Sequence, residues 1–178
     1  MVIFIYLALI FPTQNSLKID FGKEKDGHTW QIINDNVMGG MSNSKISFTE
    51  NSMLFEGVIS LQNNGGFASV RSPIRNMDLS KYTKVKMRYK SSIRNFDLIF
   101  SNDLKYYNPK YKLGFSPKTE NWETKEFLLK DAIETRMGQP TGASISDQNL
   151  KNIIRFGFIL SDKREGSFVL EIDYLEFY

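Results

Sequence analysis

The sequence predicts an all-β protein, a sandwich or barrel of antiparallel strands with one or two short helices. Three observations predict this fold class. Hydrophobic residues recur mainly at every second position, which is the period of a strand with one buried face. The strand-like runs are short and separated by turn residues, and only two brief segments have a helical pattern. The length of 178 residues also suffices for one domain to bury a core without support from a metal or disulfide.

The chain begins with an apolar run, residues 2–11, which is followed by the polar stretch Pro12–Ser16. The run is shorter than the roughly 20 residues that span a membrane, so we expect no stable membrane span. Its length and polar tail are typical of a signal peptide. We therefore expect residues 1–16 to direct export to the periplasm or the cell exterior, and residues 17–178 to form a single domain. A buried N-terminal strand in a cytoplasmic protein is the alternative.

Alternation is clearest in three of the expected strands. In residues 84–90 three apolar side chains alternate with basic ones, and in residues 154–160 four apolar side chains share one face. In residues 168–177 the alternation changes phase, and a β-bulge near Tyr174 would restore it. The two expected helices are Asp131–Thr135 and Asp147–Ile153. Further strands are expected at residues 45–48, 53–61, 67–71, 96–100, 111–115 and 123–128.

The segment Asn63–Gly66 predicts a tight turn between two of these strands. Its Asn-Gly pair favours the positive φ angles of a type I′ two-residue loop. A loop with an even number of residues places Leu61 opposite Ala68, which makes one face of the resulting hairpin wholly apolar. We therefore expect the strands on the two sides of the turn to pair. Phe67, Ser69 and Arg71 then lie on the face that is not needed for the core.

Composition and motifs argue against most common catalytic chemistries. The chain has no cysteine, which excludes thiolate catalysis, disulfides and most structural zinc sites, and it has one histidine, His28. The patterns G-x-G-x-x-G, G-x-x-x-x-G-K-[ST] and G-x-S-x-G are absent. The net charge is +3 with both signs mixed along the chain, so no basic stripe indicates nucleic-acid binding. We expect no catalytic residue, metal or cofactor, and we expect His28 to be an exposed or loop histidine.

Two segments each combine Asn or Asp, a Gly-Gly pair and then Ser. Glycine pairs permit positive φ and close backbone approach, and Asn and Asp side chains stabilise turns. These segments either fix tight turns or line a shallow polar site with backbone amides and Asn side chains, and both interpretations stay open. The candidate binding residues are Trp30, Asn34, Asp35, Met38, Gly39, Gly40, Ser42, Asn63, Asn64, Gly65, Gly66, Phe67, Ser69 and Arg71.

Asp35 and Arg71 are the charged members of these two segments. We expect them to form a charge-assisted ion pair that joins the segments, and a separation well beyond about 4 Å would refute it. Among the aromatic residues, Trp30 and Trp122 are expected to pack in the core or at its rim. The loop that contains Tyr106 and Tyr107 is expected to be exposed, where its rings could stack on a ligand.

The residues described above resemble the complex I intermediate-associated protein 30 family. Asn34–Ser42, a few residues after Trp30, is similar to the leading motif of that family, and Asn63–Arg71 is similar to its second. The resemblance extends from Leu17 to the C-terminus and implies a galactose-binding-like β-sandwich of the jelly-roll type. Mitochondrial members are chaperone-like assembly factors for respiratory complex I, which implies a non-enzymatic role. The sequence departs from the family pattern at Ser91–Phe96, where members usually carry Gly-Asp-Gly before a basic residue.

Three functions follow, in order of preference. The first is a non-catalytic binding domain that acts on a protein partner in assembly or stabilisation. The second is an exported carbohydrate-binding module, which needs Trp or Tyr rings beside polar residues in a groove. The third is a hydrolase on the same sandwich, which ranks lowest because no nucleophile or pair of acids is marked by its setting.

Overall fold

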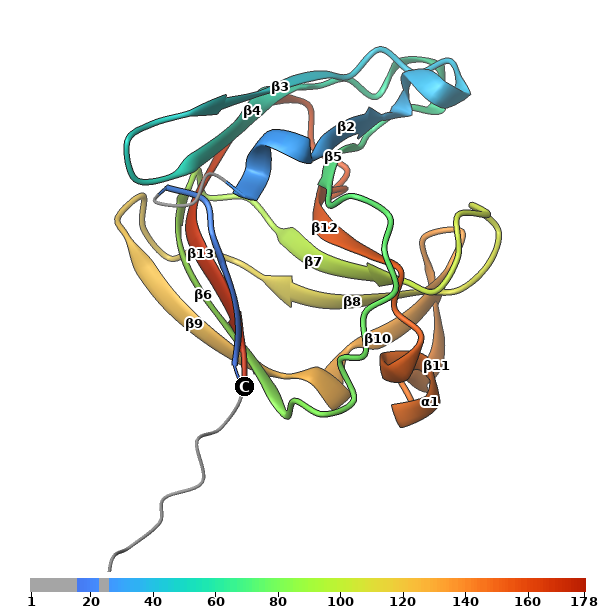
Figure 1. Ribbon diagram of the computed structural model, residues 1–178. Helices are drawn as coiled ribbons and strands as arrows, with labels where there is room; N and C mark the ends of the chain where they lie inside the picture. The colour runs from blue at the N-terminus through green and yellow to red at the C-terminus, as the bar shows by residue number, and fades with distance from the viewer. Residues whose placement is uncertain (1–15, 23–25) are drawn as a thin grey trace, which may run out of the picture.

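The computed structural model describes residues 16–22 and 26–178, which form two antiparallel sheets packed face to face (Figure 1). The fold is therefore an all-β sandwich of the jelly-roll type, as the sequence predicts. Residues 1–15, which hold most of the predicted signal peptide, lie outside the described residues.

The strands divide between a six-stranded and a seven-stranded sheet. The six-stranded sheet has the order β3 (Asn43–Phe48), β4 (Met53–Ile59), β13 (Gly166–Phe177), β6 (Lys84–Ser91) and β9 (Glu123–Leu128), with β1 (Leu17–Asp20) paired to β13. The seven-stranded sheet has the order β11 (Gln139–Ser144), β10 (Ile133–Arg136), β8 (Lys110–Phe115), β7 (Phe96–Ser101), β12 (Arg155–Leu160), β5 (Ala68–Arg71) and β2 (Gln31–Asn34).

Helical structure is sparse. Within the described part of the chain there is one α-helix, α1, and no helix is long and apolar enough to cross a membrane. The helices are α1 (Asp147–Lys151) and the 3₁₀ turns η1 (Asp26–Thr29), η2 (Asp35–Met38), η3 (Gln62–Asn64) and η4 (Leu129–Asp131).

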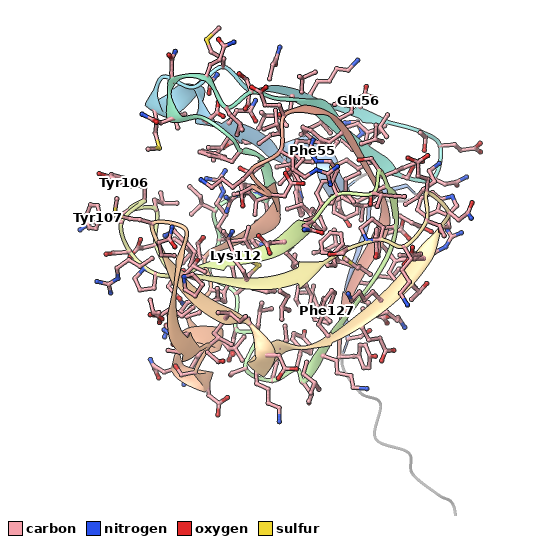
Figure 2. The ribbon with its side chains drawn as sticks, turned by 180° about the vertical axis from the view of Figure 1, so that it is seen from behind. Phe55, Glu56, Tyr106, Tyr107, Lys112 and Phe127 are labelled. Carbon is pink, nitrogen blue, oxygen red and sulfur yellow. The ribbon has the colours of Figure 1, made fainter. Side chains whose placement is uncertain are left out.

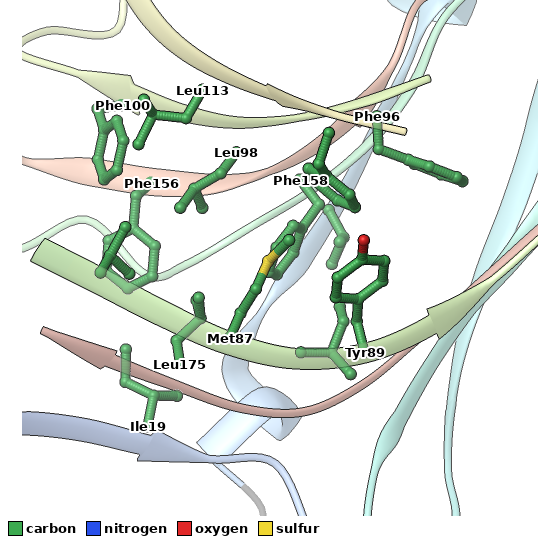
Figure 3. Close-up of a cluster of buried hydrophobic side chains, with 14 of the residues drawn as sticks. Ile19, Met87, Tyr89, Phe96, Leu98, Phe100, Leu113, Phe156, Phe158 and Leu175 are labelled. Carbon is green, nitrogen blue, oxygen red and sulfur yellow. The ribbon is translucent and has the colours of Figure 1, made fainter. Parts of the chain in front are cut away.

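The core lies between the two sheets and is filled by side chains from both (Figure 3). Met87 and Tyr89 enter it from β6, and Phe156 and Phe158 enter it from β12; each is 1% exposed or less. The basic residues of β6 point the other way, as the alternation of residues 84–90 predicts. Burial of these large side chains contributes most of the favourable free energy of folding.

The predicted β-bulge is present in β13. The register of β13 against β6 shifts between Ile172 and Tyr174, which makes Asp173 the extra residue on that strand. Because of this shift, Leu175 and Phe177 return to the core, and both are fully buried.

One of the two predicted helices is wrong. Residues 131–135 enter strand β10, and this strand pairs with β8 from Ile133 to Thr135. Both residues are β-branched, and pairing with a neighbouring strand outweighs a weak helical pattern. The other predicted helix is correct: α1 begins with a capping box in which Ser146 and Asn149 bond reciprocally.

The predicted hairpin across Asn63–Gly66 is also wrong. Strand β4 pairs with β3 and β13, whereas β5 pairs with β2 and β12, so the two strands belong to different sheets. A tight turn does occur: Asn63 and Asn64 have φ angles of 55° and 58°, and the amide of Gly65 donates to the carbonyl of Gln62 at 3.0 Å. This turn carries the chain from one sheet to the other.

Candidate functional site

The two Gly-Gly segments meet where β2 leads into η2 and where the loop after β4 enters β5 (Figure 1). Strands β2 and β5 are antiparallel neighbours, with Asn34 opposite Ala68. The amide of Asp35 donates to the carbonyl of Phe67 at 3.3 Å, which continues the pairing one residue further. We call the residues gathered here, 34–42 and 63–67, the polar corner.

The carboxylate of Asp35 is the centre of the polar corner. Its Oδ1 accepts a hydrogen bond from the amide of Ser42 at 2.9 Å. Its Oδ2 accepts from the hydroxyl of Ser42 at 2.5 Å and from the amides of Gly66 at 2.6 Å and Phe67 at 3.1 Å. Asp35 is 2% exposed, so these bonds form away from water, where charge-assisted bonds are strong. One carboxylate thus joins the two motif segments.

Two of the glycines allow the chain to approach this carboxylate. A Cβ on Gly40 would lie 2.4 Å from Cγ of Asp35, and a Cβ on Gly65 would lie 2.7 Å from its Oδ2. The other two have positive φ angles, 88° at Gly39 and 122° at Gly66, which side chains disfavour. In each pair, one glycine leaves space for the side chain of Asp35 and the other adopts the positive φ angle that the turn requires.

Other polar side chains of the two segments also bond within the protein. The hydroxyl of Ser44 donates to Oδ1 of Asn34 at 2.8 Å, and Nδ2 of Asn63 donates to the carbonyl of Gly39 at 3.2 Å. On β5, the hydroxyl of Ser69 donates to a main-chain carbonyl of β2 at 2.6 Å. The polar corner therefore fixes the course of its own loops, and its outermost side chains, among them Met38, remain exposed.

Burial raises the pKa of Asp35, but the hydrogen bonds from Ser42, Gly66 and Phe67 outweigh it and leave the pKa below the ordinary carboxyl value. The folded-state pKa is thus lower than the unfolded one. The charged carboxylate therefore contributes stability above about pH 4, and this contribution is lost as the pH falls through the folded value.

We expect the difference in free energy of unfolding between the wild type and Asp35→Asn to be constant between about pH 5 and about pH 7 and to shrink below about pH 4. Urea titrations at a series of pH values measure this difference. The charge of Asp35 would be unimportant if the difference stayed the same throughout the acid range.

The predicted ion pair between Asp35 and Arg71 is wrong. Arg71 lies opposite Gln31, at the far end of β2 from Asp35, and a strand of four residues is roughly 13 Å long. Among the described residues, no carboxylate lies within 4.0 Å of the Arg71 guanidinium. The amides and hydroxyl around Asp35 already supply the donors that an arginine would have supplied.

The aromatic candidates have separate environments. Trp30 is 7% exposed and packs in the core, so it does not line the polar corner. Trp122 is 36% exposed, and the guanidinium of Arg88 lies 4.5 Å from its ring centroid. Tyr106 and Tyr107 are 67% and 48% exposed on the loop between β7 and β8, as expected (Figure 2).

His28 is exposed in η1, as expected, and its ring stacks on Phe48 with centroids 4.1 Å apart. Within the described ranges, no group of three or more His, Cys, Asp or Glu side chains is placed to hold a metal ion.

The sequence did not predict the buried ion pair between Arg94 and Asp162. Arg94 donates from Nε to Oδ2 of Asp162 at 2.9 Å and from Nη2 to Oδ1 at 2.6 Å, and both side chains are 5% exposed or less. Arg94 also donates to the carbonyls of Arg164, Gly166 and Ser167. The two partners are 68 positions apart, and no local pattern links them. The arginine lies in the stretch that departs from the family pattern, and its acidic partner comes from the loop before β13.

Comparisons with known proteins place this geometry in context. The family model described as Complex I intermediate-associated protein 30 (CIA30) matches residues 19–172. No curated protein matches the sequence.

Among solved structures, the family 11 carbohydrate-binding module of the cellulosomal cellulase Lic26A-Cel5E of Clostridium thermocellum is similar, with a TM-score of 0.65 and 18% identity over 92% of this chain and 94% of that chain. The family 11 module from Clostridium thermocellum in complex with a β-1,3-1,4-mixed-linked tetrasaccharide has a TM-score of 0.60 and 18% identity, over 84% of this chain and 88% of that one. At this identity the likeness establishes the shared fold.

Proposed function

Because the chain belongs to the complex I intermediate-associated protein 30 family, we propose that it is a non-catalytic domain that binds a protein partner. The family description names association with an intermediate of complex I, which supports a protein as the partner. We place the contact at residues 37–41, which we call the apolar loop.

One observation carries this proposal. Val37, Met38 and Met41 are 69%, 68% and 59% exposed within a single short segment. Large apolar side chains that gather on a surface mark sites of association, because contact with a partner removes them from water. Methionine suits such a surface, since its flexible thioether side chain adapts to an irregular partner.

The support of the apolar loop favours the same function. The amide of Gly40 donates to the carbonyl of Asp35 at 3.0 Å, Asn63 holds the carbonyl of Gly39, and Ser42 binds the carboxylate of Asp35. The backbone that carries the exposed side chains is therefore already ordered. A preordered loop loses little conformational entropy when a partner binds, so more of the contact energy remains as affinity.

The double variant Val37→Ser/Met38→Ser tests the proposal. We expect affinity for the partner to fall by about 10-fold to 30-fold, because two central apolar contacts are lost. The free energy of unfolding should stay within about 0.5 kcal/mol of the wild type, because both side chains face solvent. The partner is identified beforehand by crosslinking from a photoreactive residue at position 38, and affinity is then measured with the purified pair.

Met137→Ser is the matched control, because Met137 is 66% exposed in the turn between β10 and β11. It should leave the affinity unchanged. The apolar loop would be ruled out as the contact if a photoreactive residue at position 137 gave the same crosslinks as one at position 38.

Carbohydrate binding is the second candidate, favoured by the two exposed rings of Tyr106 and Tyr107 beside β8. Aromatic faces next to polar groups suit sugar rings. The similar family 11 module with a bound tetrasaccharide supports this candidate through its fold. Export, which the apolar run of residues 2–11 predicts, would bring the domain to polysaccharides outside the cell, and N-terminal sequencing of the natural protein tests it.

A further inference from the structure

The outer face of the seven-stranded sheet carries a group of cations that neither the polar corner nor the apolar loop uses. In β12 the side chains of Phe156 and Phe158 point into the core, so Arg155 and Gly157 lie on the opposite face of the sheet. Arg71 of β5 lies opposite Gly157, whereas Arg155 lies opposite Ser101 of β7, which in turn lies opposite Lys110 of β8. We call Arg71, Arg155, Lys110 and Lys112 the outer-face cluster.

Arg71 occupies the middle of this cluster because a glycine makes room for it. A Cβ on Gly157 would lie 2.8 Å from Cδ of Arg71, so the arginine side chain passes over β12 at this position. The positive charge of Arg155 acts on Arg71, and that of Arg71 acts on Lys110.

Among the residues that the structure describes, the two lysines of the cluster are paired with acids and the two arginines are not. Lys112 lies 2.9 Å from Asp97, and Lys110 lies 3.4 Å from Asp103. Within the described part of the chain, Arg155, which is 9% exposed, donates only to neutral acceptors, the carbonyl of Ser72 and the side chain of Gln31, each at 2.9 Å.

The Nε of Arg71 is buried and has no hydrogen-bond partner among the described residues. Burial and the positive charge of Arg155 lower the pKa of Arg71 to about 10, so the guanidinium remains charged at neutral pH. Arg71 as a whole is only partly buried, and a partly buried guanidinium without a counterion is less favourable than one that an anion completes. The planar N–H groups of arginine match a carboxylate in a bidentate contact.

We propose that Arg71 and Arg155 bind the carboxylate of an acidic saccharide, such as a uronic acid unit, on the outer face of the seven-stranded sheet. This inference rests on the second candidate function and deepens it by naming the class of sugar. The exposed tyrosines favour a sugar over an acidic peptide. They belong to the same surface as the cluster, because Lys110 donates to the carbonyls of Asp103 and Lys105 and so ties the base of the tyrosine loop to it. Figure 2 shows Lys112 on β8 and both tyrosines on the loop that precedes this strand.

The test is calorimetric titration of the whole chain with an oligogalacturonate and, separately, with a neutral mixed-linked β-glucan oligosaccharide. We expect the acidic oligosaccharide to bind, and its affinity to fall by about 10-fold or more in Arg71→Met. The same variant should raise the midpoint of thermal unfolding by about 3 °C, because methionine keeps an unbranched chain over Gly157 and removes a partly buried charge that has no counterion among the described residues.

Arg136→Met is the matched control, since Arg136 is exposed at the end of β10 and the change of charge is the same. It should alter neither affinity nor midpoint. Equal binding of acidic and neutral sugars, unaffected by Arg71→Met, would overturn the anion site and leave saccharide binding intact. If neither sugar binds, both the anion site for a saccharide and the carbohydrate-binding function are overturned. Oligoglutamate is titrated as a third ligand, and if it binds while neither sugar does, the ligand is an acidic peptide and the proposal is refuted.

Discussion

Replacing Asp35 with asparagine is expected to lower the free energy of unfolding by about 3–4 kcal/mol. Oδ2 of Asp35 accepts from one hydroxyl and two amides, and Oδ1 accepts from a third amide. An asparagine has one oxygen, and its NH₂ group would face donors. Donors left buried without an acceptor cost about 1–3 kcal/mol each, so the loss exceeds that of an ordinary surface change.

Urea unfolding followed by tryptophan fluorescence measures this loss, since Trp30 is buried in the core. Asp131→Asn is the control, because Asp131 is exposed at the end of η4, and its free energy of unfolding should stay within about 0.5 kcal/mol of the wild type. A loss below about 1 kcal/mol for Asp35→Asn would mean that the carboxylate does not hold the two Gly-Gly segments together.

Removing either partner of the Arg94–Asp162 pair is expected to cost about 3–5 kcal/mol, because the remaining charge is buried without its counterion. Arg94 is 5% exposed and the Asp162 side chain 1% exposed, and two hydrogen bonds join them. Burial raises the pKa of Asp162, but the bonds and charge of Arg94 bring it below the ordinary carboxyl value. The pair joins the loop between β6 and β7 to the loop between β12 and β13, and each of these loops connects the two sheets.

A double-mutant cycle with Arg94→Met and Asp162→Ala measures the coupling. We expect the double variant to lose much less than the sum of the single losses, because no unpaired charge remains. The exposed pair Lys45–Glu56, 3.1 Å apart, is the control, and removing Lys45 should cost about 0.2–1 kcal/mol. Additive losses at Arg94 and Asp162 would show that the two side chains act independently.

The sequence predicted nine of the described strands because each of these has a buried face, and burial imposes a period of two. The short strands β1, β2, β10 and β11 were not predicted. The β-bulge in β13 followed from the same rule, since the core accepts Leu175 and Phe177 only after a change of phase. We also expected the two Gly-Gly segments to be joined, and they are, but through bonds of Asp35 to the amides of Gly66 and Phe67 in place of the predicted pair with Arg71.

The errors share one cause: local patterns do not specify which distant groups compete for a hydrogen bond. The turn at Asn63 and Asn64 suited a hairpin, yet the amides that follow it bind Asp35 and the adjoining strand pairs with β2. The expected partner of Asp35, Arg71, is held apart at the far end of β5.

By itself, the sequence determined the all-β class, the buried face of most strands and the membership of the family, because these depend on periodicity and on short motifs. Only the tertiary structure decided that Asp35 is bound by amides, that Arg94 pairs with Asp162, and that Arg71 lies over Gly157 with its Nε unpartnered among the described residues. The physical reason is that burial repeats along the chain, whereas the partner of a buried charge depends on which strands become neighbours in the sheets.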